Sequence, residues 1–321
     1  MPISRPLLLA GLPVAAASLL AASLLAPSPA GAAERSVRIG YQKYGNFLLL
    51  KQHGGLDARL KPLGFTAAWA EFPSGPPILE AVRAGAIDVG QTGDAPPIFA
   101  QAGRTDLVYV AAEPPAPAGE AILVPKDSAI ASLAGLKGKR VALNKGSNVH
   151  FLLVKALEKA GIAYGDITPV FLAPADARAA FERGAVDAWA IWDPYLAAAQ
   201  AATGARTLAT GEGLVGNIQF YLAAAGFAKA EPNVVAAIVD AVRDVDDWEA
   251  AHPDEAAAEL AEAVRLPKSV VAVALARQAH GVAPLTPEVT AGQQAEADAF
   301  LQLRLIPKPL DVGAAVWKPG T

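Results

Sequence analysis

Three predicted strand-to-helix turns combine a hydroxyl side chain with glycine, namely Ser74-Gly75, Thr92-Gly93 and Gly146-Ser147. The first turn of a helix has unpaired backbone N–H groups and a partial positive charge. Glycine also lets a bound group approach the backbone closely. Such turns can therefore bind an anion without lysine or arginine. Because serine and threonine are also ordinary helix caps, both interpretations stay open for each turn.

Other side chains near the ends of the predicted strands could complete a binding site. Trp192 could form a wall for the apolar part of a ligand, or it could pack two lobes together. Glu120 follows a proline-rich stretch, residues 114–119, and could accept a hydrogen bond in a cleft or be only an acid at a hinge. The candidate ligand-binding residues are Gln42, Asn46, Ser74, Gly75, Thr92, Gly93, Asp94, Glu120, Ser147, Asn148, Trp192 and Asp193.

Catalytic and metal chemistry find little support in this sequence. Asp94 and Asp193 could form a catalytic carboxylate pair, but both stand where a helix N-cap is expected. The absence of cysteine excludes disulfides, thiolate metal sites and cysteine nucleophiles. The four histidines are not spaced like metal ligands and are expected at the surface or at helix ends. With no nucleophile elbow, P-loop or dinucleotide fingerprint after the N-terminal segment, we expect no catalytic residue, no metal and no cofactor.

The elements that position these turns alternate between strand and helix. Residues 36–41, 65–72 and 87–90 read as strands, and helices are expected to begin at Pro76-Pro77 and after Asp94. This order is typical of an α/β fold with a mostly parallel sheet flanked by helices. In such sheets, ligands bind at the carboxyl ends of the strands, where the polar turns lie.

The strand–helix pattern occurs twice along the chain. Gly85-Ala86-Ile87-Asp88 and Gly184-Ala185-Val186-Asp187 lie 99 residues apart, as do Asp94 and Asp193. Chance similarity in an alanine-rich chain is the alternative, but a constant offset over several elements favours a duplicated architecture. We therefore expect two lobes around a cleft. The first lobe is predicted to comprise residues 34–117 plus 221–321, and the second lobe residues 118–220.

The N-terminus is typical of a secretory signal peptide, residues 1–33. Arg5 precedes an apolar run, residues 7–26, and Pro27, Pro29 and Gly31 follow it near small residues that suit cleavage. An uncleaved membrane anchor is the alternative. We expect cleavage and a periplasmic mature protein. The net charge of -4, without a basic patch, gives no sign of a nucleic-acid partner.

Three segments carry a resemblance to a known family. They are residues 71–76 (EFPSGP), residues 91–101 (QTGDAPPIFAQ) and residues 186–195 (VDAWAIWDPY). These segments resemble the periplasmic aliphatic sulfonate-binding proteins of sulfonate ABC transporters. The resemblance implies a two-lobed periplasmic-binding-protein fold with two crossings between the lobes. It also implies a small organic sulfonate in the cleft and an ABC permease in the inner membrane as partner, and we expect a monomer.

The resemblance further implies that the turns at Gln42, Ser74-Gly75, Thr92-Gly93, Ser147 and Trp192-Asp193 form the pocket. The sequence departs from the family pattern at Tyr44 to Phe47, where two aromatic rings could narrow the mouth. Taurine, nitrate, bicarbonate and a thiamine precursor are alternative ligands. An enzyme of the same fold is a further alternative, but relatives that cleave carbon–sulfur bonds use a cysteine that this chain lacks.

Overall fold

The computed structural model describes residues 35–318, so the predicted signal peptide lies outside the described residues. The strands are β1 (Arg35–Tyr41), β2 (Phe65–Glu71), β3 (Val89–Thr92), β4 (Leu107–Ala112), β5 (Glu120–Val124), β6 (Arg140–Leu143), β7 (Thr168–Phe171), β8 (Ala188–Trp192), β9 (Arg206–Thr210) and β10 (Phe220–Ala224). The α-helices are α1 (Asn46–His53), α2 (Leu56–Leu60), α3 (Gly75–Arg83), α4 (Ala95–Ala102), α5 (Asn148–Lys159), α6 (Pro174–Glu182), α7 (Tyr195–Thr203), α8 (Ala225–Ala230), α9 (Pro232–Ala251), α10 (Pro253–Val264), α11 (Lys268–Leu275) and α12 (Pro287–Gln302). Short 3-10 helices span Lys61–Leu63, Pro117–Gly119, Leu133–Leu136, Tyr164–Asp166 and Gly313–Ala315.

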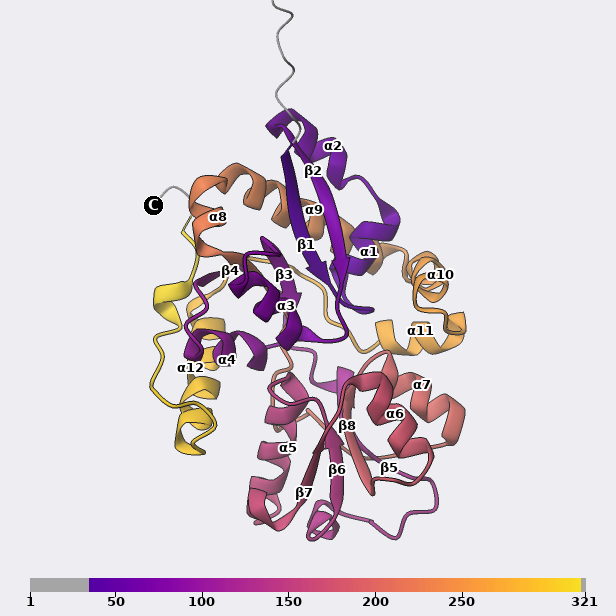
Figure 1. Ribbon diagram of the computed structural model, residues 1–321. Coiled ribbons are helices and arrows are strands. Elements are labelled where there is room, and N and C mark those ends of the chain that lie inside the picture. Colours follow the sequence, from indigo (N-terminus) through magenta and orange to yellow (C-terminus); the bar gives the residue numbers. More distant parts are fainter. Residues whose placement is uncertain (1–34, 319–321) are drawn as a thin grey trace, which may run out of the picture. The chain divides into compact units, whose positions relative to one another are not determined.

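Residues 35–318 form two five-stranded sheets, each in its own lobe (Figure 1). The strand orders are β2-β1-β3-β10-β4 in the first sheet and β7-β6-β8-β5-β9 in the second. Only β10 in the first sheet and β5 in the second run antiparallel to their neighbours. The predicted two-lobed α/β fold with mostly parallel sheets is therefore confirmed.

The two antiparallel strands mark the places where the chain changes lobe. The chain leaves the first sheet after β4 and enters the second at β5; it leaves the second after β9 and returns at β10. Each crossing ends in a strand that lies between two others of its sheet, β5 between β8 and β9 and β10 between β3 and β4. The exact extents of the lobes, residues 34–117 with 221–321 and residues 118–220, stay a prediction.

The internal repeat appears in the structure as the same set of contacts. The backbone N–H of Arg38 donates to the Asp88 carboxylate over 2.8 Å, and that of Arg140 donates to Asp187 over 2.7 Å. Each arginine side chain also bonds the same aspartate. The glycine that opens each motif adopts a positive φ, 69° and 70°, which suits glycine. These matching contacts confirm the duplicated architecture.

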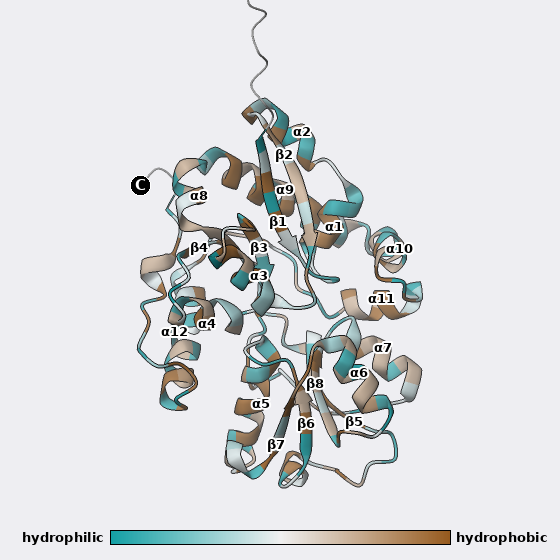
Figure 2. Cartoon of the chain, in the orientation of Figure 1, coloured by the Kyte–Doolittle hydropathy of each residue, from teal (hydrophilic) through white to brown (hydrophobic). Residues whose placement is uncertain are grey.

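The hydrophobic cores follow the alternation of side chains along the strands. In β10, Tyr221 and Ala223 join the cluster under α1, α9 and α10, whereas Phe220 and Leu222 join the cluster under α3, α4 and α12. The first sheet therefore buries both faces. The covering helices carry hydrophobic residues together with hydrophilic ones, as Figure 2 shows. Among residues 35–318, no helix combines the length and hydropathy that crossing a membrane requires.

Helix α11 reaches the second lobe. The segments after β10 were expected to return to the first lobe and cover it, and α9 and α10 do so against α1. Val270 and Ala274 of α11, however, form an apolar cluster with Ala197 and Ala198 of α7. Figure 1 shows α11 between α10 and α7. The lobes therefore touch outside the crossings as well.

Candidate functional site

The turns singled out in the sequence meet at a cavity between the lobes. The cavity lies at the ends of β1, β3 and β8 and at the starts of α3 and α5, and its volume is about 10 Å³. Its lining residues are Gln42, Tyr44, Gly75, Gly93, Pro96, Ser147, Asn148, Trp192 and Gln219. This inner cavity therefore collects six of the candidate residues at the carboxyl ends of strands, where an open α/β sheet binds ligands.

Two helix N-termini contribute to the inner cavity. Ser74 precedes α3 and Ser147 precedes α5, and neither hydroxyl caps its helix. The Ser147 hydroxyl instead donates to the backbone carbonyl of Asn144 over 2.8 Å. Gly75 and Asn148, the first residues of α3 and α5, line the cavity. The positive ends of two helices, one from each lobe, thus face one small space, which suits an anion.

Glycine is required at this cavity because neighbouring groups come very close. A Cβ atom on Gly75 would lie 2.9 Å from Cγ of Pro96 and 3.0 Å from Cβ of Thr92. A Cβ on Gly93 would lie 3.1 Å from Cβ of Asn148 in the other lobe. Thr92 is fully buried, and its hydroxyl donates to the Gly93 carbonyl over 2.9 Å. Thr92 therefore holds the turn from behind and does not line the cavity.

Asn148 links the inner cavity to a buried carboxyl group. Its amide nitrogen donates to Oε2 of Glu120 over 2.5 Å and to Oδ1 of Asn217 over 3.0 Å. Glu120 has no exposed surface, and its Oε1 atom has no partner among residues 35–318. Burial raises the pKa of Glu120 well above its usual range, and Asp94 adds to the effect. The raised pKa of Glu120 lessens the repulsion between this buried carboxyl group and a bound anion.

Asp94 and Asp193 are buried near the cavity but are absent from its lining. Asp94 accepts from the backbone N–H groups of Ala95 and Ile218 over 3.0 and 3.1 Å. Asp193 accepts from Ala197 N–H and pairs with the guanidinium of Arg277 over 3.1 Å. Burial raises the pKa of each carboxyl group to about 6, although these bonds favour the ionised form and act in the opposite direction. Both carboxylates thus have structural partners at helix starts, as the sequence indicated.

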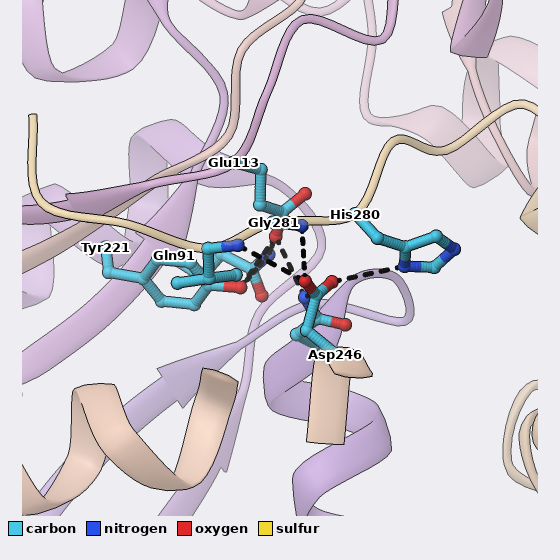
Figure 3. Close-up of polar contacts among 8 residues, drawn as sticks. Gln91, Glu113, Tyr221, Asp246, His280 and Gly281 are labelled. Atoms are coloured by element: carbon cyan, nitrogen blue, oxygen red, sulfur yellow. Dashed lines mark hydrogen bonds and ion pairs between the residues drawn. The ribbon is translucent and has the colours of Figure 1, made fainter. Parts of the chain in front are cut away.

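Asn46 lies in a different buried cluster, shown in Figure 3, and not at the inner cavity. Its amide nitrogen donates to Asp246 over 2.9 Å and to Glu113 over 3.4 Å. Asp246 also accepts from the backbone N–H of Gly281 over 2.7 Å, and Glu113 accepts from Tyr221 over 2.6 Å. Two buried carboxyl groups therefore hold the Asn46 amide away from the lining.

The aromatic pair near the first turn divides between cavity and core. Tyr44 lines the inner cavity, as the departure from the family pattern indicated. Phe47 instead is fully buried and packs edge-on against Trp69 and Tyr221, with ring centroids 6.0 and 5.2 Å apart. The expectation that both rings shape the mouth is therefore wrong for Phe47. The hydrophobic face of α1 faces the core, and Phe47 belongs to that face.

His150 lies at a helix end, one of the two places expected for the histidines. It stands in the first turn of α5 and is buried, with 2% of its surface exposed. Its Nδ1 accepts from Gly146 N–H over 3.2 Å, and its Nε2 lies 3.0 Å from the Tyr164 hydroxyl. Burial lowers the pKa of His150 to about 4, with Lys145 adding to the effect. The neutral ring thus fixes the turn before α5. No group of His, Asp and Glu within residues 35–318 is arranged to hold a metal ion.

A wider outer pocket adjoins the inner cavity. It has a volume of about 220 Å³ and shares Gln42 and Trp192 with the inner cavity. Its other lining residues are Lys43, Glu71, Phe72, Pro73 and Tyr195. The Trp192 side chain is 6% exposed and belongs both to this wall and to the core of the second lobe. Trp192 therefore lines both spaces and packs within the second lobe, whereas its contact with a ligand stays a prediction.

Sequence reasoning missed two lining residues. Pro96 stands in the predicted helix start after Asp94 and was not a binding candidate. Gln219 lies in the return crossing before β10, a segment without a turn motif. Only the two-crossing topology could have indicated Gln219, because that topology brings the crossings beside the strand ends.

Comparison with known proteins agrees with this geometry. Residues 30–265 match the model of the NMT1-like family. A putative aliphatic sulfonates-binding protein of Escherichia coli is 44% identical over 95% of this chain and 96% of its own length. A Bacillus subtilis protein of the same description is 32% identical over 87% and 84% of the two chains.

A solved structure extends the comparison. The alkanesulfonate-binding protein from Xanthomonas axonopodis pv. citri, bound to MOPS, is 44% identical. It covers 88% of this chain and 98% of its own, with a TM-score of 0.84. The chain therefore belongs to the NMT1-like family, in the group of the aliphatic sulfonate-binding proteins.

Proposed function

We propose that this chain captures an alkanesulfonate in the inner cavity and delivers it to the permease of an ABC importer. The observation that carries the proposal is the meeting of the α3 and α5 N-termini beside the Trp192 wall. The names of the related binding proteins support the same ligand class. They also place the chain among binding proteins and not among enzymes.

The physical chemistry of a sulfonate suits these residues. A sulfonate remains a monoanion throughout the biological pH range, so its partners need only donate hydrogen bonds. Backbone N–H groups at Gly75 and Asn148 can do so without a charged side chain. The organic tail needs an apolar wall, which Trp192 offers on the way to the outer pocket. MOPS, bound to the related protein, likewise joins a sulfonate to a short alkyl chain and a ring.

The setting of this function follows from the same relatives. A periplasmic location is consistent with the binding proteins to which the chain is related. We propose that residues 1–33 act as a cleaved signal peptide and that the mature chain acts as a monomer. Intact mass and sedimentation of the mature protein test both points. A full-length chain in the membrane fraction, or a stable dimer, would contradict them.

A ligand panel followed by thermal unfolding tests the proposed ligand class. A ligand that binds only the folded state stabilises it by RT ln(1 + [L]/Kd), about 2.7 kcal/mol at a hundredfold excess over Kd. Propanesulfonate and MOPS should therefore raise the Tm by several degrees. Taurine, nitrate, bicarbonate and thiamine precursors form the comparison set. A clear shift with one of these, and none with the alkanesulfonates, would overturn the proposal.

A further inference from the structure

Tyr44 stands between the inner cavity and a second, apolar space. This space, the apolar groove, has a volume of about 20 Å³ and lies beside α1, α10 and α11. Tyr44 lines both spaces, so this residue forms the partition between them. The aliphatic side chains of the groove are Leu48, Leu260, Val264, Val271 and Leu275. A methylene chain would find only apolar partners along these residues.

The partition is held in place from both ends. The Tyr44 backbone forms an isolated β-bridge with Gln42, close to where β1 ends. At the other end, the phenol hydroxyl lies 3.9 Å from the position of a Cβ atom on Gly119, in the first crossing. The ring therefore spans from the first turn to the crossing and closes the side of the inner cavity.

The outer pocket, which Tyr44 leaves open to a ligand tail, is lined by different chemical groups. The outer pocket contains the exposed Lys43–Glu71 ion pair, with 3.5 Å between Nζ and Oε1, together with the aromatic rings of Phe72, Trp192 and Tyr195. A tail that enters this pocket meets rings and charges. A tail that entered the apolar groove would instead meet mostly aliphatic side chains, with Lys43 and Gln278 also in the lining. Tyr44 thus separates two routes that suit different tails.

We propose that Tyr44 is a specificity-determining residue that blocks the apolar groove and directs ligand tails into the outer pocket. The inference rests on the proposed function. It assigns the ligand class more narrowly, to sulfonates with short, polar or ring-bearing tails and not to long alkyl chains. In the parent protein, affinity rises over the first methylenes that contact Trp192 and then levels off.

Calorimetry with linear alkanesulfonates from two to eight carbons tests this assignment. In Tyr44→Ala the partition is gone, so affinity continues to rise by roughly fourfold per methylene beyond the parent's plateau. Tyr44→Phe keeps the ring and serves as the matched control, with the same plateau as the parent. A Tyr44→Ala profile that levels off where the parent's does would overturn the assignment.

A second substitution locates the tail. Val264 is half-buried and lines the groove, so Val264→Phe fills part of the space. In the Tyr44→Ala background it should restore the plateau, and alone it should leave every affinity unchanged. If the single Val264→Phe variant changes the dependence of affinity on chain length, Tyr44 does not separate the groove from the inner cavity. This test does not require the Tyr44→Ala variant to fold. If the parent protein binds no sulfonate, the proposed function itself is wrong. If the parent binds sulfonates but Tyr44→Ala shows the same dependence of affinity on chain length, only this inference is wrong.

Discussion

The Arg277–Asp193 ion pair ties the segment after α11 to the second lobe, and its removal should weaken folding in a pH-dependent way. Arg277 donates to both oxygens of Asp193, over 3.1 and 3.3 Å, and to Gln200 over 2.8 Å. The Asp193 side chain has no exposed surface, and that of Arg277 is 23% exposed. Arg277→Met keeps much of the side-chain volume and removes only the charge and the donors.

The magnitude follows from the burial of Asp193. Removing one partner of a buried pair costs about 3–5 kcal/mol when the other charge stays unpaired. Since Arg277 is partly exposed and Asp193 can take up a proton, we expect a cost at or just below the lower end of this range, about 2–3 kcal/mol at pH 8. Burial raises the pKa of Asp193 to about 6 in the parent, so the pair is present above pH 6 and is lost as the pH falls through 6. At pH 5, the loss should shrink to about 1 kcal/mol, the contribution of the bond to Gln200.

Urea unfolding of the parent and the variant at pH 5 and pH 8 measures both values. Asp193→Asn in the Arg277→Met background should recover part of the loss at pH 8, because an amide carries no unpaired charge. Arg59→Met removes the ion pair with Asp244, in which the two side chains are 43% and 61% exposed. This control should cost less than about 1 kcal/mol at either pH. Equal losses for Arg277→Met at both pH values would refute the reasoning.

Two further predictions concern the buried carboxyl cluster and the cavity glycines. Burial raises the pKa of Glu113 from 4.5 to about 8. Between these pH values the folded state holds a proton that the unfolded state has released. The stability of the folded state therefore falls as the pH rises from 4.5 to about 8. The Tm difference between Glu113→Gln and the parent should therefore increase from pH 5 to pH 8. The exposed control Glu80→Gln should show no such trend. A Tm difference for Glu113→Gln that does not change with pH would contradict the raised pKa of Glu113. Gly93→Ala pushes a methyl group to 3.1 Å from Asn148 and should weaken ligand binding at least tenfold, whereas Gly226→Ala, with open space around it, should not. Equal calorimetric affinities for the two glycine variants would show that the close approach at Gly93 is not needed.

The sequence predicted the architecture because the repeat and the helix-opening prolines are local signals. The Gly85 and Gly184 motifs, 99 residues apart, correspond to matching strands and turns in the two sheets. The polar turns were also found, since the carboxyl ends of parallel strands meet at one edge. Gly75, Gly93 and Ser147 thus reach the same cavity as expected.

The remaining differences come from contacts between residues far apart in the sequence. Asn46 pairs with Asp246, 200 residues away, and nothing near Asn46 indicates that partner. Arg277 likewise forms an ion pair with Asp193, which the sequence had indicated as a ligand-binding candidate. Gln219 reaches the cavity only because the chain returns through it to β10. Side-chain partners of this kind depend on the complete tertiary arrangement.

The measurement that tests the central claim most directly compares head groups on one tail. Butanesulfonate, butyrate and inorganic sulfate are titrated into the mature protein by calorimetry at pH 7. If two helix N-termini hold a sulfonate beside the Trp192 wall, butanesulfonate should bind at least a hundredfold more tightly than either competitor. Sulfate lacks the tail, and the planar carboxylate has one oxygen fewer to accept hydrogen bonds. Equal affinity for butyrate, or tighter binding of sulfate, would contradict the account.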